Sequence, residues 1–177
     1  ARGPERAVLA IDPAFENADA RITAHGLAAA IRQAGPFDLI LCGEGSGDQY
    51  NQQVRARIAA LLDIPCITFV SKLELTEGGV RAERKLEDGV EVVEAAFPVV
   101  VTVMPDLNKP RIPGLKQVMG ARKKEVRTFD AAALGLGEAQ LAARADVRSL
   151  RAPASNRRQV KVGSVEELAD AIAAAVR

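Results

Sequence analysis

The chain has 177 residues, 48% of them hydrophobic, and a net charge of +1, which is typical of one soluble globular domain with a buried core. Aromatic residues make up only 3% and tryptophan is absent, so few side chains are available for base stacking, which disfavours nucleic-acid binding. The longest apolar runs, such as FPVVVTVM, are far shorter than the roughly 20 residues of a membrane span, so we expect no direct membrane insertion.

Two strand–helix units open the chain. Residues 7–11 (AVLAI) and 37–42 (FDLILC) are short apolar runs typical of buried parallel strands. Apolar residues recur at helical spacing over residues 18–34, where Gly35-Pro36 ends the pattern, and again over residues 52–62. This order predicts an α/β fold with an open, mainly parallel, Rossmann-type sheet that has helices on both faces.

An antiparallel insertion follows these units. Three β-rich pieces are separated by Glu77-Gly78-Gly79 and by Glu87-Asp88-Gly89, whose composition is typical of hairpin turns. A β-meander is therefore predicted, and PVVVTV, residues 98–103, is predicted to return to the main sheet. The three pieces are residues 67–75, 80–86 and 90–93.

The end of the chain has a different composition. Beyond Thr128 the sequence is rich in alanine and arginine with weak periodicity, and it finishes in SVEELADAIAAAVR. Ser164 and Glu167 form the capping-box pattern of a terminal helix. We therefore expect a main domain over residues 1–127 and a C-terminal arm, ending in a helix, over residues 128–177.

A glycine-rich stretch, GEGSGDQYNQQV, connects a predicted strand to a predicted helix over Gly43–Val54. Ligands of open α/β sheets bind at such turns, where glycines let backbone N–H groups approach a phosphate at the positive end of the helix. The stretch matches neither GxGxxG nor the P-loop pattern. Taken alone, it is compatible both with a nucleotide site and with a plain surface turn.

A second stretch, MPDLNKPRIPGLKQVMGARKK, combines prolines, glycines and basic residues over Met104–Lys124. We expect a rigid, solvent-facing loop that joins no helix or strand. Leu115 lies between Gly114 and Lys116 with no apolar neighbour. Its side chain is therefore either an exposed anchor for a partner or a residue that packs back onto its own domain.

Together these stretches resemble the β subunit of electron-transfer flavoproteins, in particular the branch linked to nitrogen fixation and carnitine metabolism. The resemblance runs from about Ala7 to Lys124, and its most specific part is the pattern that starts at Asp106. It implies an adenine nucleotide α-hydrolase-like fold. It also implies that an amino-terminal third precedes the point where this chain begins.

The resemblance further implies a heterodimer that carries electrons rather than converting a substrate on its own. The α subunit of such proteins holds a redox-active FAD, and the β subunit holds AMP or, in bifurcating members, a second FAD. The arm over residues 128–177 is then expected to pack on the α subunit. Electrons pass from flavin dehydrogenases to a quinone oxidoreductase or another acceptor, and the flavin supplies the chemistry. We expect a cytoplasmic location.

Family positions transfer to this chain residue by residue. The nucleotide contacts fall on Gly43, Gly45, Ser46, Gly47, Asp48, Asn51, Gln52, Gln53 and Val54. One departure follows them: Arg55 stands where the family usually has glycine. An arginine there can pair with a phosphate or can block the close backbone approach that glycine permits.

The same transfer makes Met104–Lys124 a recognition loop that docks on a partner dehydrogenase. Its expected contact residues are Arg111, Pro113, Leu115, Lys116 and Met119, with Leu115 as the apolar anchor. The basic residues of the loop either steer an acidic partner or form a solvated face.

Other functions receive less support from the sequence. His25 lies in a helix pattern with no catalytic neighbours and is expected to be structural, while Cys42 and Cys66 are expected to be reduced core thiols. No metal-ligand spacing occurs. The alternative is a nucleotide-binding regulatory module of the same fold without electron transfer. RNA binding through Arg122–Lys124 is disfavoured by the low net charge.

Overall fold

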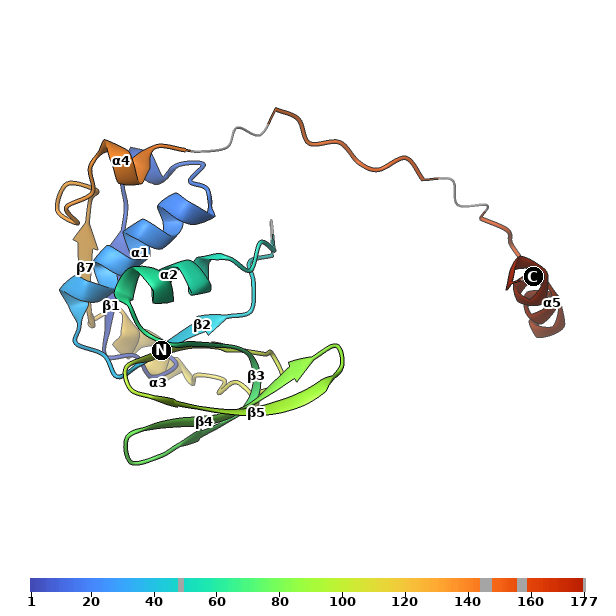
Figure 1. Cartoon of the computed structure of the whole chain (residues 1–177), viewed down its shortest axis with the longest axis horizontal. Helices are drawn as coiled ribbons and strands as arrows, with labels where there is room; N and C mark the ends of the chain where they lie inside the picture. Colours follow the sequence, from blue (N-terminus) through green and yellow to red (C-terminus); the bar gives the residue numbers. More distant parts are fainter. Residues whose placement is uncertain (48–49, 144–147, 156–158, 177) are drawn as a thin grey trace. The chain divides into compact units, whose positions relative to one another are not determined.

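The computed structural model describes residues 1–47, 50–143, 148–155 and 159–176. The chain divides into two compact units, Ala1–Ala145 and Asp146–Arg177. All strands of the described residues lie in the first unit, whose helices and strands are labelled in Figure 1.

The main sheet has five strands in the order β2-β6-β3-β4-β5. β6 lies between β2 and β3 and is parallel to both, whereas β3, β4 and β5 form an antiparallel meander. The predicted meander and the predicted return of the chain to the main sheet are therefore confirmed, as is the α/β class. The strands are β2 (Leu39–Gly43), β3 (Cys66–Leu75), β4 (Gly79–Leu86), β5 (Gly89–Ala96) and β6 (Val99–Val103).

A second, two-stranded sheet departs from the expected single sheet. β1 (Arg6–Ala10) pairs in parallel with β7 (Glu125–Phe129), from Arg6 opposite Glu125 to Ala10 opposite Phe129. β7 was not predicted, because four of its five residues are exposed and it directly follows a run of basic residues. A strand with so little buried side chain carries a weak hydrophobic signal.

Two helices cover one face of the main sheet (Figure 1). α1 (Ala20–Ala34) begins at Asp19, whose carboxylate accepts a hydrogen bond from the Ile22 N–H at 2.8 Å. Ala24 of α1 packs with Ile58 of α2 (Val54–Leu62) and with Val100 of β6. A small alanine at this contact lets the two helices and the sheet approach closely.

The core cluster on the opposite face of the sheet consists of strand and loop residues. The long strands of the meander bend (Figure 1), and their inner side chains pack against those of β6 and against Leu107. This cluster contains no helical residue. Its fully or nearly fully buried members are Ile67, Val70, Val80, Ala82, Val99 and Val101.

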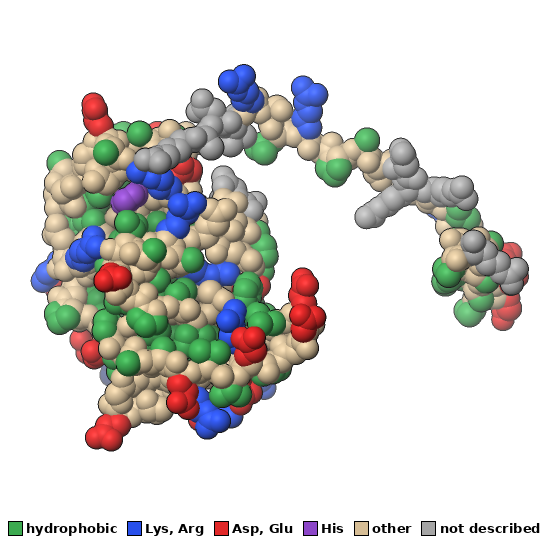
Figure 2. Space-filling model, in the orientation of Figure 1, with side chains coloured by type: hydrophobic (Ala, Val, Ile, Leu, Met, Phe, Trp, Pro, Cys, Tyr) green, Lys and Arg blue, Asp and Glu red, His purple; other side chains and the backbone are tan. Residues whose placement is uncertain are grey.

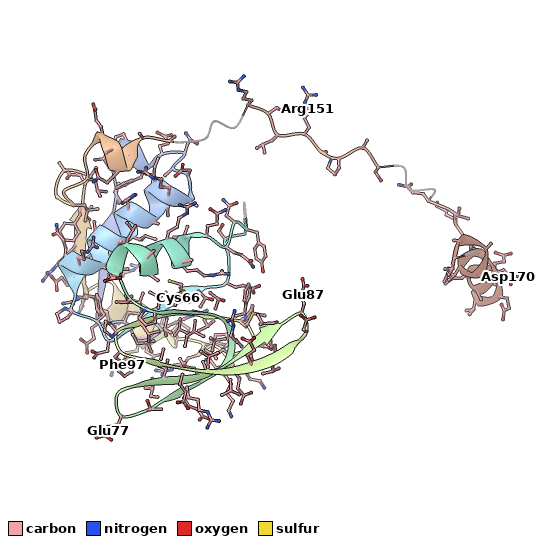
Figure 3. The ribbon with its side chains drawn as sticks, in the orientation of Figure 1. Cys66, Glu77, Glu87, Phe97, Arg151 and Asp170 are labelled. Atoms are coloured by element: carbon pink, nitrogen blue, oxygen red, sulfur yellow. The ribbon has the colours of Figure 1, made fainter. Side chains whose placement is uncertain are left out.

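Both hairpin turns carry the acidic residues seen in the sequence. Glu77 lies at the tip of the β3–β4 hairpin and Glu87 at the tip of the β4–β5 hairpin (Figure 3). Acidic side chains are accordingly found at both tips in the space-filling view (Figure 2). The tips are thus solvated turns, as their composition predicts.

The segment that follows β7 belongs to the first unit. Arg21 of α1 donates to the Ala139 carbonyl at 2.7 Å, and Gln33 donates to the Ala133 carbonyl at 2.6 Å. The Asp12 carboxylate accepts from the Ala131 N–H at 3.0 Å. These bonds hold the segment after β7 to the first unit. The short helices of the first unit are η1 (Pro13–Phe15), α3 (Leu115–Ala121) and α4 (Glu138–Leu141).

The second unit contains α5 (Val165–Val176). The Glu167 N–H donates to Ser164 Oγ at 3.1 Å, which is one half of the predicted capping box. The Glu167 carboxylate accepts from the Gly163 N–H, at 2.7 Å, rather than from Ser164. In the part of the chain that the structure describes, no helix has the length and apolar character needed to cross a membrane.

Candidate functional site

A cavity of about 550 Å³ lies where the carboxyl end of β2 and the amino end of α2 meet α1. This volume falls within the usual range of small-molecule sites. Its wall includes most of the nucleotide-contact residues expected from the sequence: Gly43, Gly45, Ser46, Asn51, Gln52, Gln53 and Val54. Gly47 is not part of the wall, and Asp48 lies outside the described residues.

The amino end of α2 offers hydrogen-bond donors to this cavity. The first turn of a helix has backbone N–H groups without intrahelical partners. Gln53, the residue that caps α2, makes no side-chain capping bond to them. An anion in the cavity would therefore meet the first-turn N–H groups of α2 and the positive end of the helix dipole.

Sequence reasoning missed the contribution of α1 to the wall. Thr23 and Leu27 of α1 line the cavity, as does Cys42 of β2. Nothing in a helical repeat indicates which of its residues face a ligand, because that depends on how the helix packs. Their spacing of four residues, with Thr23 polar and Leu27 apolar, is the only local signal.

Arg55, on the first turn of α2, lies in the cavity wall and is only 5% exposed. Its Nη1 donates to the backbone carbonyl of Glu44. Its guanidinium carbon lies 5.0 Å from the centroid of the Phe69 ring, a cation–π distance. The buried Nε has no hydrogen-bond partner among the described residues.

Tyr50 braces the glycine-rich loop. Its hydroxyl donates to the Glu44 carboxylate, and this bond raises the pKa of Tyr50 above its ordinary value. The Tyr50 ring lies against Gly45, where an added Cβ would come within 2.8 Å of the ring. Gly45 is therefore needed for close packing at this point rather than for an unusual backbone angle.

Both cysteines are free and half-buried. Cys42 lines the cavity, whereas Cys66, at the start of β3 (Figure 3), does not. Burial raises the pKa of each thiol, and the positive charge of Arg55 partly opposes this effect. Both thiols are therefore protonated at neutral pH.

The predicted recognition loop contains a helix, so our expectation that it joins no helix or strand was wrong. α3 begins at Leu115. The Gly114 N–H before it donates to Gln117 Oε1 at 2.9 Å. No proline occurs between Pro113 and the end of α3, so nothing in the sequence interrupts these two turns.

Leu115 is 77% exposed and does not pack back onto its own domain. Ile112 is 89% exposed and Met119 62% exposed, and Val118 is also exposed. We call Ile112, Leu115, Val118 and Met119 the α3 surface. Its expected basic neighbours Arg111 and Lys116 are exposed, whereas Pro113 is partly buried.

The remaining candidates are His25 and a possible metal site. His25 lies on α1, where burial and the nearby Arg21 and Arg32 lower its pKa, so it is neutral at pH 7. The described ranges contain no group of three or more histidine, cysteine or acidic residues arranged to hold a metal ion.

The cavity and the α3 surface both fall within a recognised family domain. A family model described as the electron transfer flavoprotein domain matches residues 1–134 of the 177. The match includes β1 to β7, both helices that line the cavity, and α3. This chain therefore belongs to the electron transfer flavoprotein domain family.

Proposed function

We propose that the chain is the β subunit of a heterodimeric electron-transfer flavoprotein of the nitrogen-fixation and carnitine-type branch. Its cavity holds AMP or a second FAD, and its α3 surface docks a flavin dehydrogenase. The redox-active FAD is held mainly by the α subunit. Electrons leave to a quinone oxidoreductase or another acceptor in the cytoplasm.

The observation that carries this proposal is the cavity at the carboxyl end of β2. It combines glycines, the amino end of a helix and a buried arginine, all of which favour a phosphate. Apolar wall residues such as Leu27 and Val54 suit the flat face of a base. The cavity thus fits a nucleotide in both its charged and its apolar parts.

The α3 surface supports the docking part of the proposal. An apolar cluster surrounded by exposed basic side chains favours a partner whose apolar pocket has an acidic rim. Such a small contact gives specific docking with fast release, which an electron carrier requires. Ile112 joins Leu115 here as a second anchor that the sequence did not single out.

The terminal helix supports a heterodimer. Val165, Leu168, Ile172 and Val176 are exposed at helical spacing on α5. An apolar stripe of this kind is stabilised when another surface covers it. We assign that role to the α subunit. The arm of residues 128–177 would contact it through the residues that belong to the second unit.

The test is to coexpress the chain with an electron-transfer flavoprotein α subunit, purify the complex, and count FAD and AMP per heterodimer. One FAD with one AMP indicates a simple carrier, and two FAD indicate electron bifurcation. A complex that lacks nucleotide beyond the FAD of the α subunit contradicts the role of the cavity. Nucleotide binding without any α-subunit complex instead favours the regulatory-module alternative.

A further inference from the structure

Arg55 is a buried charge that finds no carboxylate partner among the described residues. It is only 5% exposed, yet no carboxylate among the described residues lies within 4.0 Å of its guanidinium. Removing a charge from water is costly unless an opposite charge and hydrogen bonds replace the lost hydration. The described residues therefore compensate the charge of Arg55 only in part.

The contacts that Arg55 does make satisfy little of its donor capacity. A guanidinium has five N–H donors. One hydrogen bond, from Nη1 to the Glu44 carbonyl, is formed with the described residues, and Nε is buried without a partner. The Phe69 ring, 5.0 Å away, offers attraction to the charge but accepts no conventional hydrogen bond.

The position of Arg55 places this charge next to other features that favour an anion. It is the second residue of the nine-residue helix α2, and it shares the cavity wall with Ser46 and Gln53. The helix amino end and the guanidinium therefore act on the same space with the same sign. A planar guanidinium also matches the oxygen pairs of a phosphate better than an ammonium does.

We infer that Arg55 binds the phosphate of the nucleotide and makes the cavity selective for phosphorylated nucleotides over uncharged nucleosides. This inference rests on the proposed nucleotide site and deepens it by naming the side chain that determines selectivity. Of the two roles considered for an arginine at this position, pairing with phosphate is favoured by the donors that have no partner among the described residues.

The test compares AMP with adenosine, which differ by the phosphate alone. Calorimetric titration of the full chain, stripped of bound nucleotide, gives both dissociation constants for the wild type and for Arg55→Gln. The ratio of adenosine to AMP dissociation constants should fall by about 10- to 100-fold in Arg55→Gln, the range expected for losing hydrogen bonds to a charged group. The ratio for Arg55→Lys should lie between those of the wild type and Arg55→Gln.

Two further variants sharpen the comparison. Arg81→Gln removes the same charge from β4, outside the cavity, and should leave the ratio unchanged. Arg55→Met retains an unbranched stem against Phe69 without the charge. It replaces Arg55→Gln if circular dichroism shows that Arg55→Gln is unfolded.

An equal weakening of AMP and adenosine would show that Arg55 only braces the wall through Glu44 and Phe69. Unchanged binding of both would likewise overturn the inference. If the wild type binds neither compound, the proposed nucleotide site itself is wrong.

Discussion

The Lys85 ammonium on β4 lies 2.5 Å from the Asp106 carboxylate, which ties the meander to the beginning of the segment Met104–Lys124. Leu107, the next residue, packs against the core cluster formed by the side chains of β3, β4 and β6. The segment is therefore fixed where it leaves the sheet, while the α3 surface a few residues later is exposed. An anchored base and an exposed apolar tip favour docking without refolding of the segment.

The first prediction concerns this ion pair and pH. The hydrogen bond from Lys85 lowers the pKa of Asp106. A carboxyl with a lowered folded pKa contributes stability above its unfolded pKa, near 4, and loses that contribution as pH falls through the folded value. Asp106→Asn should therefore lower the urea midpoint slightly at pH 7, since both partners are half-exposed.

The same comparison at strongly acidic pH is the check. Below the folded pKa of Asp106 the wild type and Asp106→Asn should have the same urea midpoint. A difference that is equally large at both pH values would mean that the variant acts through packing rather than through the charge.

The second prediction concerns Leu115. Burying a leucine in a partner's pocket contributes about 1.5 to 3 kcal/mol. Leu115→Ala should thus raise the apparent KM for reduction by the cognate dehydrogenase by roughly ten-fold or more. Its thermal stability and flavin content should match the wild type, because the side chain is 77% exposed.

Leu75→Ala is the matched control for Leu115. Leu75 is also largely exposed, but it lies at the end of β3, outside the α3 surface. Its replacement should change neither KM nor stability. Should Leu115→Ala cost a core-like 2 to 5 kcal/mol of stability and leave electron transfer per folded molecule unchanged, the anchor hypothesis is wrong.

The third prediction uses the two cysteines as internal reporters. Cys42 lines the cavity and Cys66 does not, although the thiols are similarly buried. Because burial raises the pKa of each thiol, alkylation should be slow at neutral pH and should accelerate as pH rises. Saturating AMP should slow the alkylation of Cys42 more than that of Cys66, as measured by peptide mass spectrometry. If AMP protects both thiols equally, or protects neither of them, Cys42 does not line the ligand site.

The fourth prediction concerns α5. Ile172→Asp places a charge in the exposed apolar stripe. It should reduce recovery of the α subunit in copurification, because the charge would be buried at the interface. Asp170→Asn is the control on the same helix and should leave recovery unchanged. The stability of the first unit should not change, since Ile172 belongs to the second.

Much of the fold could be predicted because its long elements carry strong periodic signals. The apolar repeat of α1 and the turn residues of the meander determined those elements to within a few residues. The separate pairing of β1 with β7 could not be predicted, since strand partners depend on contacts distant in sequence. α3 was missed because the prolines before it dominated the interpretation of the segment.

The cavity wall could be predicted in part. The glycine-rich loop identified one wall of the cavity, because a strand-to-helix turn has a local signature. The contributions of Thr23 and Leu27 depend on the packing of α1 and leave no such signature. The sequence showed that Arg55 is unusual, but its burial against Phe69 follows from the tertiary structure alone.

Tyr50 has one practical consequence for studying this molecule. The chain contains no tryptophan and a single tyrosine, so its ultraviolet emission above the phenylalanine background comes from one ring. That ring lies against Gly45 in the cavity wall, and its hydroxyl is bonded to Glu44, the residue whose carbonyl Arg55 holds. The protein therefore carries a native fluorescent probe next to the proposed ligand site, and nucleotide titrations can be followed without any label.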